Sequence, residues 1–169
     1  MGIKLAKALG NDVMAISSSP GKESMAKEKG ADFFACSKDP ESMKANAGKC
    51  DLILNTVSAN HDINTYIPLL AKGGSTLVQL GGVVTPHSLS QLPLMFNRIS
   101  VAGSLIGGIR ETQEVIDLCF KHGIYPDCIM VEAKDIDDCW EKLTQTNADG
   151  VRYVIDIKKS LENKDHLPK

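Results

Sequence analysis

Three consecutive serines followed by a lysine form the first segment whose residue types suggest a binding chemistry. Ser17, Ser18 and Ser19 follow an apolar segment, and Lys22 stands three residues after Ser19. Where such a strand end meets the ribose of a nucleotide, an acidic residue accepts from the hydroxyls and repels a 2′-phosphate. Hydroxyls and an ammonium group instead suit a doubly charged phosphate, which favours NADP over NAD. The same residues also suit a serine-rich turn that caps the next helix, so both interpretations stay open.

Three further segments are candidates to line a ligand crevice, because the carboxyl ends of parallel strands open at one edge of a sheet. Residues 55–58 read Asn-Thr-Val-Ser, and they equally suit a turn in which Ser58 or Asn60 caps a helix. Residues 80–83 and 103–108 carry glycines just past expected strands, where glycine permits close approach to a ligand or simply makes a turn. Each segment is a weak signal alone, but three at successive strand ends indicate one shared crevice.

The cysteines and histidines do not form a pattern that favours metal binding or nucleophilic catalysis. Cys119 and His122 are three residues apart on an expected helix, with Cys128 and Cys139 further on, whereas structural zinc sites usually show closer paired spacing. We interpret the cysteines as small core residues. The histidines fall in loops or at helix ends, where solvation or a helix C-terminus is the usual environment; they are His61, His87, His122 and His166. No Ser–His–Asp arrangement can be argued from these positions.

Composition narrows the class of protein. The chain has 169 residues, 43% hydrophobic and 24% charged, which is enough to bury the core of a single domain. No apolar run approaches the roughly 20 residues that a membrane span needs, and the start does not look like a signal peptide. A net charge of −2 gives no general attraction to nucleic acid. Five cysteines without a Cys-x-x-Cys pair favour a reducing compartment, so we expect a cytoplasmic protein without nucleic-acid or membrane partners.

Apolar and amphipathic segments alternate along the chain, which predicts an α/β fold. The expected strands, rich in β-branched residues as in a sheet covered on both faces, are 12–16, 51–57, 75–80, 99–102, 128–131 and 153–157. The expected helices, several of them followed by glycine, are 1–9, 21–29, 60–71, 110–122 and 135–146. This alternation predicts right-handed crossovers and a doubly wound parallel sheet. The polar residues 160–169 are expected to form a frayed tail.

The chain opens inside an expected helix, although a doubly wound domain is expected to begin on a strand. Neither a strand nor a Gly-x-Gly-x-x-Gly pattern precedes residues 1–9. We therefore expect a sheet without its first strand, which in the order 3-2-1-4-5-6 lies between the two halves. The remaining strands would present unpaired edges, so we expect the isolated chain to be marginally stable or prone to aggregation.

Several stretches resemble the zinc-type medium-chain alcohol dehydrogenases, and in particular their cinnamyl alcohol dehydrogenase-like branch. They are residues 1–10, 13–19, 30–32, 103–112 and 151–156. The resemblance covers the chain apart from its tail. It implies an incomplete, Rossmann-like NADP-binding domain over residues 1–130, the C-terminal helix and strand of the catalytic domain over residues 131–159, and a tail over residues 160–169.

The resemblance also implies which residues contact the cofactor. Ser17, Ser18, Ser19 and Lys22 would hold the 2′-phosphate of NADP, while Thr56 and Val57 would line the crevice. Gly81 and Val83 would approach the nicotinamide ribose, Ser104, Leu105 and Ile106 would contact the nicotinamide, and Arg152 would reach the pyrophosphate.

By the same resemblance, the complete enzyme interconverts small aldehydes and primary alcohols by hydride transfer with NADPH, while zinc polarises the substrate oxygen. The family's zinc ligands and proton relay are not found in this chain, so we expect it to be inactive alone. Relatives pair into dimers through the strand that runs from Ile99 to Gly103, which makes a homodimer the expected assembly. The alternative is a non-catalytic NADPH-binding or dimerisation module. A methyltransferase is disfavoured, because Ser17 stands where a ribose-binding acid would be needed.

Overall fold

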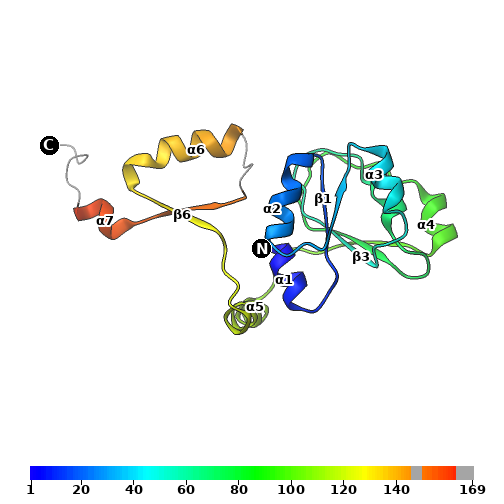
Figure 1. Ribbon diagram of the computed structural model, residues 1–169, viewed down its shortest axis with the longest axis horizontal. Helices are drawn as coiled ribbons and strands as arrows, with labels where there is room; N and C mark the ends of the chain where they lie inside the picture. The colour runs from blue at the N-terminus through cyan, green and yellow to red at the C-terminus, as the bar shows by residue number, and fades with distance from the viewer. Residues whose placement is uncertain (146–149, 163–169) are drawn as a thin grey trace. The chain divides into compact units, whose positions relative to one another are not determined.

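The computed structural model describes residues 1–145 and 150–162, and it divides into two compact units. The larger unit spans residues 2–122, and the smaller one begins at Gly123 (Figure 1). The boundary that the sequence predicts after residue 130 refers to the domains of a complete dehydrogenase, and it stays a prediction. Within the described residues, no helix combines the length and the apolar character that crossing a membrane requires.

The larger unit alternates helices with parallel strands. Its strands are β1 (Met14–Ser17), β2 (Phe33–Cys36), β3 (Leu52–Asn55), β4 (Thr76–Gln79) and β5 (Ser100–Gly103). Its helices are α1 (Gly2–Ala8), α2 (Glu23–Glu28), α3 (Pro40–Ala45), α4 (Gln91–Asn97) and α5 (Ile109–His122), with 3-10 turns η1 (Pro20–Lys22), η2 (Ile63–Thr65) and η3 (Ile67–Leu69). In Figure 1, α1 and α2 stand on one side of the strands, and α3 and α4 stand on the other. This is the arrangement of a doubly wound fold.

The strands form two separate parallel groups. β1 pairs with β2, whereas β3, β4 and β5 pair in chain order. Within the described residues no ladder joins β1 to β3, so each of these strands keeps one unpaired edge. The two groups match the halves of a Rossmann-like sheet, and the fold class predicted from the sequence is confirmed.

The core lies against one face of β3 and β4. Leu69 and Leu77 are fully buried, and they cluster with Ile53, Ile67, Leu70 and Ile99. Successive residues of a strand point to opposite faces, so Ile53 and Asn55 are buried while Leu52 and Leu54 are exposed. The β3–β4–β5 sheet is therefore covered on one face and open at Leu52 and Leu54 on the other.

An ion pair ties α1 to the chain just before β2. Lys7 Nζ lies 2.7 Å from each carboxylate oxygen of Asp32, and the backbone N–H of Val13 donates to Asp32 Oδ2 at 2.8 Å. These hydrogen bonds, that of Lys7 first, lower the pKa of Asp32. Gly10 and Gly30 follow α1 and α2 in the left-handed conformation, with φ of 83° and 102°, so the glycine stops predicted for these helices are confirmed.

Parts of the predicted secondary structure are wrong. The helix expected over residues 60–71 is replaced by η2 and η3, because Asp62 caps a short turn through Asn64 N and Pro68 lacks an N–H. The prediction also missed three elements of four to seven residues, which are β2, α3 and α4. Segments this short carry little periodicity, and α4 ends at Arg98 in a left-handed conformation rather than at a glycine.

The smaller unit holds one parallel pair of strands, β6 (Cys128–Val131) and β7 (Arg152–Ile155), with η4 (Ala133–Asp135), α6 (Ile136–Gln145) and α7 (Ile157–Glu162). β6 has its predicted bounds. The strand predicted through residue 157 stops at Ile155, and the tail predicted from Ser160 is corrected, because Ser160 is buried in α7. Its hydroxyl accepts from Ala133 N and donates to Asp156 O. Residue 146 of the predicted helix and residues 163–169 of the tail lie outside the described residues.

Candidate functional site

Three of the predicted segments begin at one edge of the β3–β4–β5 sheet. The register places Asn55 opposite Gln79 and Gln79 opposite Gly103. The ladder continues one step further, since Leu80 N donates to Asn55 O at 2.9 Å and Ser104 N donates to Gln79 O at 3.1 Å. The residues that follow these strands therefore share the carboxyl edge, where ligands bind in open parallel sheets.

Gly81 is held against the turn that follows β3. Its backbone N–H donates to Asn55 O at 2.9 Å. A Cβ added at Gly81 would collide with the carbonyl group of Val57 and lie 2.9 Å from the carbonyl carbon of Thr56. The structure thus gives a packing reason for glycine here, whereas the contact of Gly81 and Val83 with a ribose stays a prediction.

The side chains of the three serines after β1 are only partly used in hydrogen bonds. Ser17 Oγ accepts a hydrogen bond from Ser19 N at 3.2 Å. Ser19 stands at the N-cap position of η1, but its side chain makes no capping hydrogen bond. In this structure, Ser19 therefore does not cap η1 through its side chain. Ser18 and Ser19 are exposed, and within the described part of the chain the Lys22 ammonium makes no ion pair.

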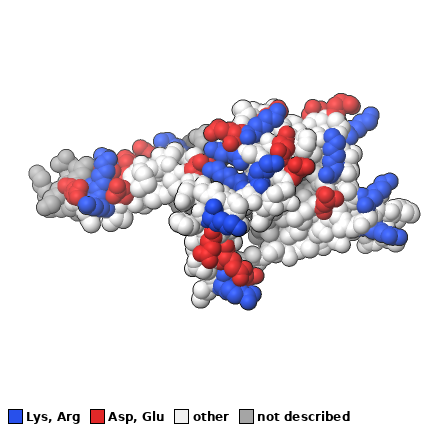
Figure 2. All heavy atoms as spheres, turned by 60° about the horizontal axis from the view of Figure 1, so that its bottom comes forward, with Lys and Arg blue, Asp and Glu red and all other residues white. Residues whose placement is uncertain are grey.

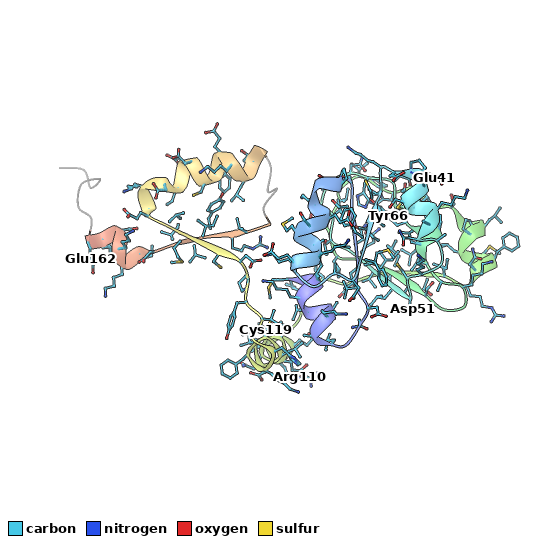
Figure 3. All side chains as sticks on the ribbon, viewed as in Figure 1. Glu41, Asp51, Tyr66, Arg110, Cys119 and Glu162 are labelled. Carbon is cyan, nitrogen blue, oxygen red and sulfur yellow. The ribbon has the colours of Figure 1, made fainter. Side chains whose placement is uncertain are left out.

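The residues after β5 lead into α5. Leu105 and Ile106 are 86% and 90% exposed, which leaves two adjacent apolar side chains in solvent at the carboxyl edge. Beyond them Glu111 Oε2 accepts from Gly108 N at 2.8 Å and so caps the start of α5. Arg110 is the second residue of α5, and Figure 3 labels it together with Cys119 on this helix. Contact of Ser104, Leu105 and Ile106 with a nicotinamide stays a prediction.

A buried amide, Asn55, joins these loops. It belongs to the segment 55–58 that was predicted to line the crevice, but no role of its own was predicted for it. Asn55 is 6% exposed, and its Nδ2 lies 2.7 Å from Gln79 Oε1 and 2.8 Å from His61 Nε2. Its Oδ1 accepts from Val57 N at 3.2 Å. His61, interpreted from the sequence as a loop histidine, also contacts Tyr66 and His87 edge to face. A polar amide at an inward-facing strand position was the signal available in the sequence.

An open pocket of about 380 Å³ lies beside this amide, lined by Asn60, His61, Asp62, Thr85, Pro86, His87 and Ser88. It is bounded by the loop after β3 and the loop after β4. None of the cofactor-contacting residues predicted from the sequence lines it.

The described residues do not fit a zinc site. No group of three or more His, Cys, Asp or Glu side chains comes together among them in a way that would hold a metal ion. All five cysteines are free thiols. Cys139 is buried as predicted for a core residue, and Cys36, Cys50 and Cys119 are partly buried, but Cys128 is exposed, so the core interpretation is wrong for Cys128. Burial raises the pKa of the Cys50 thiol, and the charge of neighbouring Asp51 adds to the effect.

Arg152 is exposed on β7 of the smaller unit, so its contact with a pyrophosphate stays a prediction. Figure 2 shows acidic and basic side chains interspersed over the face drawn.

Comparison with known proteins decides the family. The family model described as zinc-binding dehydrogenase matches residues 1–121. The chain belongs to this family. A probable formaldehyde dehydrogenase of Bacillus subtilis, AdhA, is 40% identical over 157 residues, which are 93% of this chain and 44% of that protein. The chain thus spans less than half the length of this curated relative.

Solved structures of dehydrogenases have the same fold. A cinnamyl alcohol dehydrogenase from Sorghum bicolor superimposes with a TM-score of 0.87 and 36% identity, covering 95% of this chain and 45% of that one. A cinnamyl alcohol dehydrogenase from Helicobacter pylori, described as complexed with NADP(H), gives a TM-score of 0.76 and 34% identity over the same shares. The resemblance to this branch that the sequence analysis describes is confirmed.

Proposed function

We propose that residues 1–130 form the NADP(H)-binding part of an alcohol dehydrogenase, and that this part binds NADP(H) in preference to NAD(H). The observation that carries this proposal is the loop after β1, where the exposed Ser18 and Ser19 and the half-buried Lys22 stand in place of a carboxylate. The 2′-phosphate of NADP needs donors and a positive charge, and a carboxylate would repel it. The Helicobacter pylori relative described as complexed with NADP(H) supports the assignment.

The residues at the carboxyl edge fit the rest of the cofactor. Thr56, Val57, Gly81 and Val83 lie in adjoining loops, and Ser104, Leu105 and Ile106 follow the next strand in the same sheet. We propose that these groups bind and orient the ribose and the nicotinamide, which supplies the hydride when bound. The proposed role of Arg152 is an ion pair with the pyrophosphate.

The proposed reaction of the complete enzyme is reduction of small aldehydes, or oxidation of primary alcohols, by hydride transfer. The relatives named a formaldehyde dehydrogenase and cinnamyl alcohol dehydrogenases support this reaction class. Because the described residues do not fit a zinc site, we assign them cofactor binding and no role at zinc. We propose that residues 1–169 do not turn over substrate on their own.

A homodimer is the assembly that we propose for this chain. Ser100 N and Ser104 N donate towards β4, so the N–H groups of Val101 and Gly103 point to the opposite edge of β5. Within the described residues that edge pairs with no strand. A second copy of β5 would satisfy it.

The test is a titration of the folded 169-residue chain with NADPH and with NADH, followed by nicotinamide fluorescence. We expect tighter binding of NADPH, and we expect Lys22→Glu to weaken it about tenfold or more while NADH binding changes little. Lys72→Glu is the matched control, because Lys72 is exposed and precedes β4 at the opposite end of the strands.

Circular dichroism confirms that each variant is folded before it is titrated. Equal affinity for the two cofactors, or an equal loss on Lys22→Glu and Lys72→Glu, would contradict the phosphate-binding role of the loop. A folded chain that binds neither cofactor would overturn the proposed function itself.

A further inference from the structure

Asn55 stands where β3, β4 and two loops meet. Its amide oxygen accepts from Val57 N at 3.2 Å, and its amide nitrogen lies 2.7 Å from Gln79 Oε1 and 2.8 Å from His61 Nε2. Its backbone carbonyl accepts from both Leu80 N and Gly81 N at 2.9 Å. One residue therefore links the turn after β3 to the neighbouring strand and to the loop that carries His61.

These contacts allow one assignment of protons. An amide nitrogen donates two hydrogen bonds and accepts none, so Gln79 Oε1 and His61 Nε2 must both accept. His61 Nε2 is then unprotonated, and the neutral ring carries its hydrogen on Nδ1. Ala59 O lies 2.7 Å from that nitrogen and accepts the bond. The network is complete only with His61 neutral and in this tautomer.

We propose that Asn55 is a positioning residue of the cofactor crevice: its side chain fixes the turn at residues 56–58 and holds His61 as the Nδ1–H tautomer. The inference rests on the proposed function, because it takes Thr56 and Val57 to line that crevice. Asn55 itself is buried and faces away from solvent, so it acts through the turn and not by touching the ligand.

Because Asn55 is buried, its hydrogen bonds matter for the stability of the turn. A buried amide that loses its partners costs free energy, whereas a satisfied one holds the groups around it in one geometry. The turn has little freedom, since Gly81 packs against the Val57 carbonyl and Asn55 holds the Val57 N–H. His61 in turn packs on Tyr66, with ring centroids 5.9 Å apart, and on His87 at 5.4 Å.

Asn55→Asp is the decisive variant, because it keeps the shape and removes both donors. The carboxylate accepts only, so we expect His61 to take a proton on Nε2. Gln79→Glu is the matched control: it adds the same charge, keeps an oxygen that accepts from Asn55, and does not contact His61.

The tautomer is read from two-bond ¹H–¹⁵N correlation spectra of the chain labelled at histidine, which contains four histidines. In the wild type and in Gln79→Glu we expect an unprotonated Nε2 and a protonated Nδ1 at His61. In Asn55→Asp we expect the Nε2 signal to move to the protonated range. We also expect NADPH binding to weaken about fivefold or more in Asn55→Asp and to change little in Gln79→Glu.

Each outcome bears on one part of the inference. A wild-type His61 protonated on Nε2, or a tautomer unchanged by Asn55→Asp, would overturn the network, and the wild-type spectrum tests it even if the variant does not fold. A changed tautomer with unchanged NADPH affinity would overturn the positioning role while the proposed function stands. A wild type that fails to bind NADPH would instead remove the proposed function, with the tautomer still measured independently.

Discussion

At the scale of single residues, two neighbouring glycines in the loop after β4 have different environments. Gly81 packs against the backbone of the turn after β3, so any side chain there must displace Thr56 or Val57. Gly82 has open space on the side where a Cβ would stand. The loop therefore needs glycine at its first position for packing and tolerates a methyl group at its second.

Gly81→Ala is expected to destabilise the chain by about 1–3 kcal/mol, the usual cost of forcing an extra carbon into a packed site. Gly82→Ala, the matched control, is expected to change the free energy of unfolding by less than about 0.5 kcal/mol. Urea denaturation of the two variants beside the wild type measures both values. Equal effects would contradict the close approach of the two turns.

At the scale of elements, the sequence predicts what is long or strongly patterned. β3 and β4 lie inside the segments predicted from their apolar residues, and α5 begins one residue before its prediction. The error over residues 60–71 has a clear cause, since Ile63, Ile67 and Leu70 follow helical spacing while Pro68 interrupts the hydrogen bonds. The periodicity correctly indicates which side chains are buried, since Ile63 is buried in η2, Ile67 in η3 and Leu70 directly after η3.

The segments that form the candidate site could be predicted from the sequence, but the hydrogen-bond network that holds them in place could not. The strand-end segments could be named because parallel strands bring their carboxyl ends together whatever lies between them. The Asn55–His61 contact joins a strand to a loop, and its geometry depends on η2, which the sequence did not predict. Polar networks of this kind depend on side-chain positions that local pattern does not encode.

The unpaired edge of β5 leads to a prediction about the proposed homodimer. Ala102 is exposed, and pairing of two β5 strands would bring the two copies of this residue close together. We expect Ala102→Lys to convert a wild-type dimer to a monomer, because two ammonium groups would then face each other. Sedimentation velocity measures the change.

Gln91→Lys adds the same charge to exposed α4 and is expected to leave the dimer intact. A wild-type chain that stays monomeric at every concentration tested would remove β5 as an interface between two copies. A dimer that survives Ala102→Lys would place the interface elsewhere.

At the scale of the whole molecule, the larger unit leaves apolar groups uncovered in several places, among them the open face of β3, the segment beyond β5, and Met95 and Phe96 on α4. Leu52 and Leu54 are exposed on the open face of β3, and Leu105 and Ile106 are exposed beyond β5. Exposed apolar groups of this kind mark surfaces that bind other protein chains or promote aggregation. The aggregation expected from the sequence stays a prediction, and these four side chains are among the exposed apolar groups through which it would act.

The separation of the two strand groups has a consequence for cooperativity. β1 and β2 share no backbone hydrogen bond with β3, and the largest fully buried side chains, Leu69 and Leu77, lie in or against the second group. Ile16 of β1 packs against the Leu77 core, but without a shared ladder the two strand groups can open in separate cooperative steps. In native-state hydrogen exchange, we expect the β1 and β2 amides to exchange through a lower-energy opening than those of β3 and β4. The same opening free energy for all four strands would instead show that they open as one cooperative group. If the two strand groups open separately, the β1 loop that carries Ser18 and Ser19 can unfold and refold while the Leu77 core stays native. Binding of the 2′-phosphate by this loop would then slow exchange most in β1 and β2.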